Sequence, residues 1–560
     1  MAESVISYLH PHMQTSVVDN STVIDQQVNS GTAMFMPYFS SRGIDGKIER
    51  YTSYSQFLAD KGAPNFKKHG QAIYNILQFL RGGGVVYCTR ILPEDAKAAQ
   101  AVIGKKLQGY DAQDAETVVE GQIKYYKLVD SKQDGDKLLT FSCKGRGEYG
   151  NKISANLRLN TSLTSTYNNA VYELSVIESG VLVEGPYYVA LNPEARDLSG
   201  ASMFIEHVVG EYSDRISVEL NEDKYDALCE ELVGKKLGKD AKAALEVDDI
   251  FTLDFLGASI NGIAVQLEDG TEGEAVFTKG KVTTKGSELL AAAFGHKDLK
   301  NKRQYPIDIL MDANFEASVK SAMVALANER GDVFSYFDVT TAKSNSVEAA
   351  LQGRNEDTIS DRKHAVYGQS FVIHDSFTNS DVVMSATYLL AYKVPANDAT
   401  YGIQYPLAGP ARGTLTGFKS MSFNPSPAEK EELYKARVNY AEQDYRTTKL
   451  MSQLTAQEAT SALSNINNMR VLLRMIRRVE EISENYFFEF ASPTTLTHFQ
   501  SAINSYLSTW VSNGACTSCE GKVFQNDYDV AQKVVRVSVE LVFTGIIERI
   551  VIEFNVGDNK

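Results

Sequence analysis

One stretch limits the possible folds more than any other, because it has the pattern of strand, helix and strand in succession. Tyr305 to Met311 (YPIDILM) is an apolar run of strand length, and Val333 to Val339 (VFSYFDV) is another. Between them, Phe315 to Glu329 carries an apolar stripe at helical spacing: Val319, Met323 and Leu326. This order predicts two parallel strands with a right-handed crossover, so we expect an α/β fold.

A second unit of the same kind lies nearer the beginning of the sequence. Ser53 to Lys61 predicts a short helix, and Gly70 to Leu80 an amphipathic one. The glycines of Arg81 to Gly84 end that helix, and the apolar run Val85 to Ile91 predicts a buried strand.

Other segments predict a more mixed architecture. Tyr172 to Val176 and Val181 to Val183 flank a turn sequence, as in a hairpin. Further expected elements are polar surface excursions over 112–137 and 222–248, a β-rich loop over 271–285, helices over 429–450, 462–482 and 495–511, and a strand over 533–543. With 560 residues, the chain has room for about three or four domains.

The charge balance argues against a nucleic acid or a membrane as partner. The chain has 56 basic and 71 acidic residues, a net charge of −15, and no block of Lys or Arg. No apolar run approaches the roughly 20 residues of a spanning helix. The first twenty residues lack the basic lead and apolar core of a signal peptide, so none is expected.

The five cysteines suggest a reducing compartment, because they are few and odd in number. Cys516 and Cys519 have CxxC spacing, but neither a second pair nor suitably spaced histidines stand nearby. Gly514 and the following FQNDYD predict an irregular loop rather than a redox motif at a strand-to-helix turn. We therefore expect two incidental thiols and no metal site.

Enzyme motifs are missing from the sequence. There is no P-loop, no GxSxG and no HExxH, and no GxGxxG opens a helix after a strand. Asp308 and Asp312 lie on and just after a predicted parallel strand, where α/β enzymes place catalytic groups. Capping of the following helix by Asp312 or Asn314 is the favoured interpretation, since no second charged cluster converges there. No cofactor is expected.

The predicted helix over 462–482 carries a basic stripe, here defined as Arg470, Arg474, Arg477 and Arg478. These residues recur at i, i+4, i+7 and i+8 and so share one helical face. One interpretation is a solvated face with local Arg–Glu pairs, worth only tenths of a kcal/mol each. The other is docking on an acidic protein surface, because arginine is favoured at interfaces.

The sequence closes on an alternating segment, TGIIERIVIEFNV, from Thr544 to Val556. Alternation of this kind is the signature of a half-buried strand, and an uncovered strand edge is a template for pairing with another chain. The apolar residues that such a strand would donate are Ile547, Ile550, Ile552, Phe554 and Val556.

An ordered series of segments then suggests a family. The series is SRGIDGKIERYTSYSQFLADKGAP from Ser41, the glycine break and VVYCTRI, GRGEYGNKISANLRL from Gly145, VYELSVIESGVLVE, LNPEARDLSGASMFIEHVV, the YPIDILMDANF unit, the segment from Val382 to Gly409, and NNMRVLLRMIRRVEEIS with the residues after it. In this order they resemble the contractile tail sheath proteins of bacteriophages and related contractile injection machines. The resemblance covers most of the chain except about 95–140 and 221–250, and VPAND departs from the family's usual proline segment.

The resemblance implies a structural role. Family members stack as six-fold rings around a rigid tail tube, and contraction drives the tube through the host envelope. Extended terminal arms join neighbouring subunits, which here would be residues 1–25 and 544–560. The resemblance further implies a core of mixed sheets, a C-terminal α+β domain that faces the tube, and a tail location after assembly in the host cytoplasm. The basic stripe is the candidate tube contact.

The implied organisation divides the chain into consecutive parts. These are an arm over 1–25, a first core part over 26–160 with an excursion near 95–140, an inserted β-rich region over 161–300, an α/β unit over 301–409, a C-terminal domain over 410–543, and an arm strand over 544–560. Expected partners are further copies of the chain, the tail tube protein, and baseplate and tail terminator proteins. An α/β enzyme with an unrecognised active site, or a shell protein that does not contract, are the alternatives.

Overall fold

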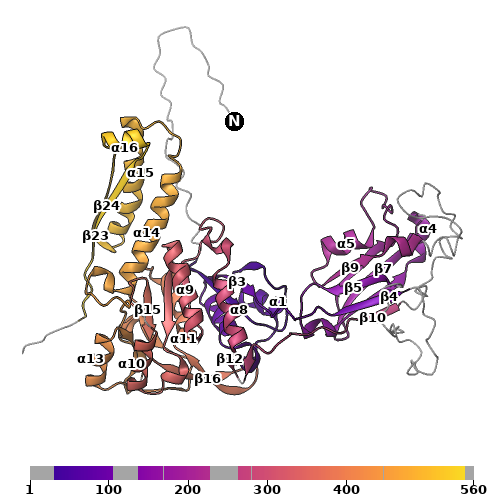
Figure 1. The fold of residues 1–560 in the computed structure, drawn as a ribbon, viewed down its shortest axis with the longest axis horizontal. Helices are drawn as coiled ribbons and strands as arrows, with labels where there is room; N and C mark the ends of the chain where they lie inside the picture. The colour runs from indigo at the N-terminus through magenta and orange to yellow at the C-terminus, as the bar shows by residue number, and fades with distance from the viewer. Residues whose placement is uncertain are drawn as a thin grey trace, which may run out of the picture.

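The computed structural model describes residues 31–104, 137–167, 169–226, 263–278, 280–357, 359–445 and 447–548. Figure 1 shows three regions: a central sheet with its helices, a β-rich domain to one side, and a tall unit of helices and a β-ribbon. Each of the three has its own cluster of buried apolar side chains.

The central sheet has seven strands in the order β2-β3-β1-β13-β14-β15-β20. All neighbouring strands are parallel except β2, which pairs antiparallel with β3. The buried strands are almost wholly apolar, as expected of a parallel sheet covered on both faces. The predicted parallel pair is confirmed as β13 and β14, with α9 as the crossover. The strands are β1 (Ala33–Tyr38), β2 (Ile48–Tyr51), β3 (Val85–Arg90), β13 (Ile309–Met311), β14 (Phe334–Asp338), β15 (His364–Tyr367) and β20 (Val438–Asn439).

Helices pack in pairs against this sheet, α3 with α11 and α8 with α9. Gly82, at the end of α3, makes the first pairing possible: a Cβ there would lie 2.5 Å from the Tyr392 carbonyl oxygen and 2.7 Å from Pro395 Cγ. The predicted glycine break therefore serves close helix packing as well as helix termination. The helices are α1 (Tyr54–Lys61), α2 (Phe66–His69), α3 (Ala72–Arg81), α8 (Thr284–Phe294), α9 (Ala317–Arg330), α10 (Val347–Glu356) and α11 (Thr387–Thr400).

Small sheets extend the central region at one end. They comprise β16 (Ser370–Asp375), β17 (Ser380–Ser385) and β19 (Ser420–Met421), then β18 (Thr414–Leu415), β21 (Ala441–Gln443) and β22 (Thr448–Leu450), and the hairpin β11 (Phe277–Thr278) with β12 (Lys281–Val282). The short helix α12 (Gly409–Arg412) precedes β18. The hairpin lies within the β-rich loop expected over 271–285.

The helix expected over 429–450 is correct only in its first part. Helix α13 spans Pro427–Lys435, where Ser426 and Glu429 form a capping box. Arg437 has a φ of 57°, a left-handed conformation that turns the chain out of the helix. The remaining residues form β20, which pairs with β15 at the sheet edge, and then the hairpin of β21 and β22. The pairing of β20 with a strand far away in the sequence is not revealed by periodicity.

The β-rich domain contains two antiparallel sheets, β4-β5-β9 and β10-β6-β7-β8, around one apolar core. The predicted hairpin is confirmed as β7 and β8, which pair across Ser179 and Gly180. Its elements are β4 (Gln100–Gly104), β5 (Lys137–Cys143), β6 (Ile153–Leu159), α4 (Thr161–Tyr167), β7 (Val171–Glu178), β8 (Val181–Ala190), α5 (Ile205–Tyr212), β9 (Ile216–Leu220) and β10 (Ile263–Gln266).

The domain boundary expected at residue 160 falls inside this domain, because β6 pairs with both β7 and β10. The chain enters and leaves the domain at adjacent points, where the Lys97 amide donates to the Thr271 carbonyl at 2.9 Å. We call the segment between these two residues the inserted domain.

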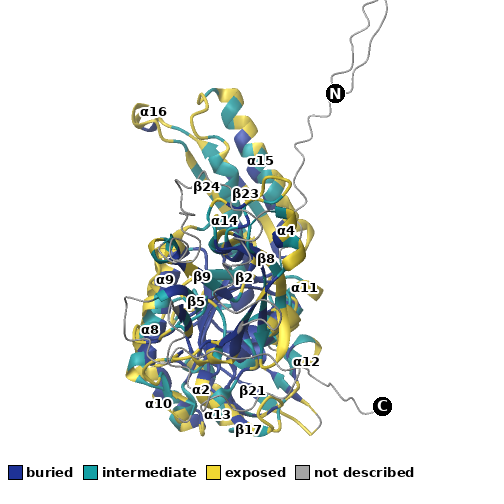
Figure 2. Ribbon diagram, turned by 90° about the vertical axis from the view of Figure 1, so that its right-hand side faces the viewer, coloured by how far each residue is buried: buried dark blue, intermediate teal, exposed yellow. Residues whose placement is uncertain are grey.

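The C-terminal unit consists of α14 (Ile466–Glu484), α15 (Pro493–Ser512), β23 (Cys516–Phe524), α16 (Asp527–Gln532) and β24 (Arg536–Phe543). Its two strands form a ribbon against α15. Figure 2 shows buried residues concentrated in the central sheet, whereas exposed residues dominate the end of this unit around α16.

The CxxC pair lies in strand β23, not in the irregular loop that was predicted. A bulge between Cys516 and Ser518 shifts the alternation by one residue, so both thiols face the apolar core of the unit. Both cysteines are free thiols. Burial raises the pKa of each, which keeps them protonated and unreactive.

Candidate interaction site

Two arginines of the basic stripe point into the subunit. Arg470 forms a bidentate pair with Asp398, with Nη1 to Oδ1 at 2.9 Å, and these side chains are only 9% and 4% exposed. Arg477 bridges two aspartates, at 2.8 Å to Asp308 and 2.9 Å to Asp332. These pairs join α14 to the central sheet and to α11.

The other two members of the stripe are more accessible. Arg474 lies 3.1 Å from Asp308 and is 32% exposed, and Arg478 lies 2.8 Å from Glu481 and is 29% exposed. The local Arg–Glu pairing expected of a solvated face is therefore found at Arg478 alone within the stripe. Tube contact by the stripe stays a prediction. Arg474 and Arg478 are the members whose side chains are accessible enough to make such a contact.

Asp308, which faces two arginines of the stripe, has a lowered pKa in spite of its burial. Burial opposes ionisation of Asp308, but Arg474 and Arg477 outweigh it and hold the pKa of that carboxyl below its ordinary value. Asp398 also accepts a hydrogen bond from Thr32 Oγ1 at 2.6 Å. The aspartates come from three separate segments of the sequence, so the stripe alone could not identify them as partners.

Helix α14 also joins two hydrophobic cores. Ile466, Met469 and Leu473 pack in the core of the central sheet, whereas Val471 and Met475 pack in the core of the C-terminal unit. Because a single helix contributes to both, a movement of one core relative to the other would deform or displace α14.

The β23–β24 ribbon offers open strand edges. The two strands pair with each other, and no third strand joins them in the described part of the chain. Beyond β24, Ile547 is 81% exposed, and Tyr434 donates a hydrogen bond to Glu548 at 3.1 Å. The other candidate residues of the arm strand (Ile550, Ile552, Phe554 and Val556) and the N-terminal arm over 1–25 lie outside the described residues.

A buried polar cluster stands where an α/β enzyme would place its catalytic groups. Asp312 and Asp338 are fully buried, and Lys320 is 2% exposed. Asp312 accepts from the amides of Ala313 and Phe315 at 2.7 and 2.8 Å, so it orders the loop before α9 and does not cap the helix, whose N-cap is Glu316.

Lysine 320 completes this cluster. Lys320 Nζ donates to the Asp338 carbonyl at 2.5 Å and lies 3.0 Å from Asp357. Burial, with Asp312 as a neighbour, raises the pKa of Asp338 to about 8. Lys320 thus ties the end of β14 to α9, and the Thr387 amide of α11 donates to Asp338 at 3.2 Å. The arrangement supports a structural role. No cluster of potential metal ligands occurs among the described residues.

Comparisons with solved structures identify the fold. The crystal structure of the sheath tail protein from Desulfitobacterium hafniense aligns with 96% of this chain and 100% of its own, with a TM-score of 0.51 and 11% identity. The sheath tail protein from Listeria innocua aligns over 92% and 95%, with a TM-score of 0.54 and 12% identity. The chain has the fold of a sheath tail protein.

Comparisons of the sequence alone identified no relative. Neither the protein-family models nor the curated proteins that were searched match the chain. Within the described residues, no helix combines the length and apolar composition needed to cross a membrane.

Proposed function

We propose that this chain is a structural subunit of a contractile sheath. The observation that carries the proposal is the alignment of the fold over almost the whole of two sheath tail proteins, including one of them from end to end. A structural role also agrees with the buried Asp312–Lys320–Asp338 cluster, whose polar atoms are used inside the subunit.

The subunits would be joined by strand augmentation at the C-terminal ribbon. An arm strand that pairs with an open edge of β23 or β24 supplies main-chain hydrogen bonds that do not depend on side-chain identity. Its apolar residues would each contribute about 1.5–3 kcal/mol if fully buried. Such a tether can persist while the bodies of the subunits exchange one set of contacts for another.

In the assembled state, rings of six subunits would stack into a sheath around a tail tube. Contraction of the sheath would drive the tube through a host envelope. The partners would be neighbouring copies, the tube protein, and baseplate and terminator proteins, in a particle tail assembled in the host cytoplasm. The energy would be stored in subunit packing, so the proposal requires no nucleotide and no cofactor.

Electron microscopy of the purified chain tests the proposal. We expect helical tubes or stacked rings, and discrete particles at every protein concentration would contradict it. Removal of Thr544–Lys560 should give folded subunits that no longer polymerise. Removal of Gly557–Lys560 alone is the matched control, because it leaves the alternating segment intact, and it should polymerise normally.

Tube contact by the stripe has its own test. Arg474→Glu with Arg478→Glu should prevent co-assembly with the tube protein, while the buried Arg470 and Arg477 stay unchanged to preserve the fold. Unaltered co-sedimentation of the double variant with tubes would remove these two residues from the tube interface.

A further inference from the structure

The turn between α14 and α15 exposes an unusual amount of aromatic surface. Phe487, Phe488 and Phe490 are 68%, 107% and 89% exposed, and Glu489 lies exposed among them. We call residues 487–490 the aromatic loop. Phe488 has a φ of 66°, which a bulky side chain rarely adopts and which marks a constrained position. Clustered exposed aromatic side chains are typical of interaction sites.

The aromatic loop is held in a defined shape by the residues around it. At its base, Tyr486 stacks on Phe499 of α15 with ring centroids 4.3 Å apart. At its end, the Ser492 amide donates to the Phe490 carbonyl at 2.7 Å, and the Ser492 side chain caps α15. A loop ordered before binding loses little conformational entropy when it docks.

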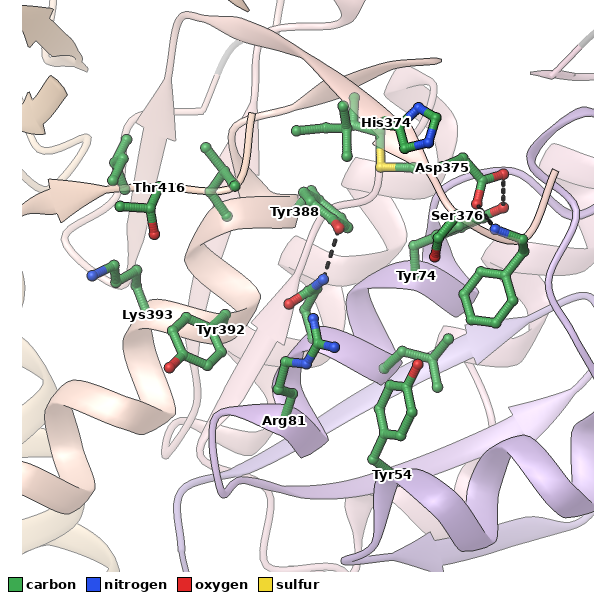
Figure 3. Close-up of a pocket in the computed structure, with 18 residues that line it drawn as sticks. Tyr54, Tyr74, Arg81, His374, Asp375, Ser376, Tyr388, Tyr392, Lys393 and Thr416 are labelled. Atoms are coloured by element: carbon green, nitrogen blue, oxygen red, sulfur yellow. Dashed lines mark hydrogen bonds between the residues drawn. The ribbon is translucent and has the colours of Figure 1, made fainter. Parts of the chain in front are cut away.

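A pocket of about 430 Å³ lies elsewhere on the same subunit, among α1, α3, α11 and the end of β16. Figure 3 shows its walls, with Tyr54 and Arg81 on one side and Tyr392 and Lys393 on another. We call it the tyrosine pocket, because its lining includes Tyr54, Tyr74, Tyr388 and Tyr392. Its volume and aromatic walls suit large apolar side chains.

The tyrosine pocket also presents positive charge. Arg81 lies over the Tyr54 ring at 5.5 Å, and neither Arg81 nor Lys393 has a carboxylate partner among the residues that the structure describes. Burial alone lowers the pKa of Lys393, as expected for an amine without a counter-ion. The pocket's own carboxylate is already used, because Asp375 accepts from Tyr74 Oη at 2.8 Å and from the Phe377 amide at 3.0 Å.

The loop and the pocket are complementary in both apolar surface and charge. One offers phenylalanines around a glutamate, and the other offers aromatic walls with an arginine and a lysine. Glu489 has no ion-pair partner among the described residues, just as Arg81 and Lys393 have none. Arginine and aromatic side chains are the residue types that dominate binding energy at protein interfaces.

We propose that the aromatic loop of one copy docks in the tyrosine pocket of a second copy, with Glu489 paired to Lys393 and Arg81. The contact joins two different surfaces, so it is heterologous and generates rings or helices rather than closed dimers. The proposal rests on the self-assembly argued above. It adds a contact between subunit bodies to the tether formed by the arms.

Zero-length cross-linking tests this contact directly. Assemblies grown from an equal mixture of isotopically labelled and unlabelled full-length chain are treated with a carbodiimide, which condenses a carboxylate with an adjacent amine. We expect Lys393–Glu489 peptides that combine labelled and unlabelled halves. Assemblies without this mixed peptide would overturn the docking proposal alone, whereas the absence of any assembly would contradict the sheath function.

Charge reversal gives a second, independent measurement. Glu489→Lys and Lys393→Glu should each raise the concentration needed for assembly by about tenfold, and the double reversal should recover most of the loss. Failure of the double variant to recover would contradict the pairing. Lys435→Glu is the matched control, since Lys435 is an exposed lysine that pairs with Glu431 within α13, away from the tyrosine pocket, and it should leave assembly unchanged.

A substitution in the aromatic loop tests the contribution of its phenylalanines to assembly. Phe488→Ala should weaken assembly by about tenfold or more, because docked aromatic side chains are common hot spots of binding. Circular dichroism should show an unchanged fold, since Phe488 is fully exposed within one subunit. Assembly of the variant at the concentration of the parent chain would remove the loop from the interface.

Discussion

The C-terminal unit and the inserted domain are both attached to the central sheet, but in different ways. The C-terminal unit shares a helix with the sheet, since α14 contributes to two apolar cores and is fixed by buried guanidinium–carboxylate pairs. The inserted domain has an apolar core of its own. Its junction is polar: Arg90 donates to the Arg146 carbonyl at 2.8 Å, and Arg146 pairs with Asp45 at 2.6 Å.

The C-terminal unit is therefore attached rigidly to the central sheet, whereas the inserted domain is attached through a weaker, polar contact. Buried ion pairs add little net stability, but removing one partner leaves a buried charge uncompensated, so they penalise any altered arrangement. A polar junction without a shared apolar core resembles a transient interface and permits relative motion. We therefore expect the central sheet and C-terminal unit to behave as one cooperative body and the inserted domain as another.

The largest expected difference is between removal of the inserted domain and removal of the C-terminal unit. Replacing residues 98–270 with a short Gly-Ser linker should leave a folded protein with a melting temperature within about 3 °C of the parent, because the ends of the domain are adjacent. Removing residues 462–548 should abolish cooperative unfolding, since the central core loses Ile466, Met469 and Leu473. Calorimetry distinguishes the two, and equal damage from both deletions would contradict the comparison.

A single substitution in the ion pairs that attach α14 should also strongly lower the free energy of unfolding. Arg470→Ala leaves Asp398 buried without its partner and should cost about 3–5 kcal/mol in the free energy of unfolding. Arg478→Ala on the same helix is the control, and because its pair is partly exposed the loss should stay below about 1 kcal/mol. Denaturant titration measures both, and equal losses would show that burial does not decide the outcome.

The stability of the rigid body should depend on pH. Asp338 has a pKa of about 8 in the fold, whereas an unfolded aspartate has about 3.9. Between these values the folded state binds the extra proton, so this group's contribution is fully present below about pH 4 and is lost as pH rises through 8. Asp338→Asn should therefore become more stable relative to the parent as pH increases, by at most about 1.4 kcal/mol per pH unit. A difference that is constant from pH 4 to 8 would argue against a protonated Asp338.

The smallest effect is expected at the polar junction. Arg146→Ala removes a pair whose arginine is 33% exposed, and it should cost about 1 kcal/mol or less. It should also increase amide hydrogen exchange in the junction segment around Asp45 without changing exchange in α14. Faster exchange throughout the central sheet would show that the two bodies are coupled more tightly than we infer.

The strand–helix–strand unit could be predicted because its pattern is local. Tyr305 to Val339 contains both strands and the crossover, and the structure has them as expected. The hairpin of β7 and β8 was predictable for the same reason. The boundary at residue 160 was not, because β6 finds β10 more than a hundred residues away and periodicity carries no information on distant pairing.

The candidate site shows the same limit. The helical spacing of the basic stripe could be read from the sequence, but the aspartates that bind Arg470 and Arg477 could not. The bulge at Cys516 concealed strand β23, since one extra residue reverses the alternation. The aromatic loop was visible as three phenylalanines in four residues, but only the structure shows that they are exposed.

The length of α14 gives its attachment a mechanical consequence. A helix of 19 residues extends over about 28 Å, from Ile466 in the core of the central sheet to the aromatic loop after its end. A rotation of about 10° at the central sheet would therefore displace that loop by about 5 Å. A small angular change at the base of this lever arm is thus enough to withdraw a side chain from a binding pocket.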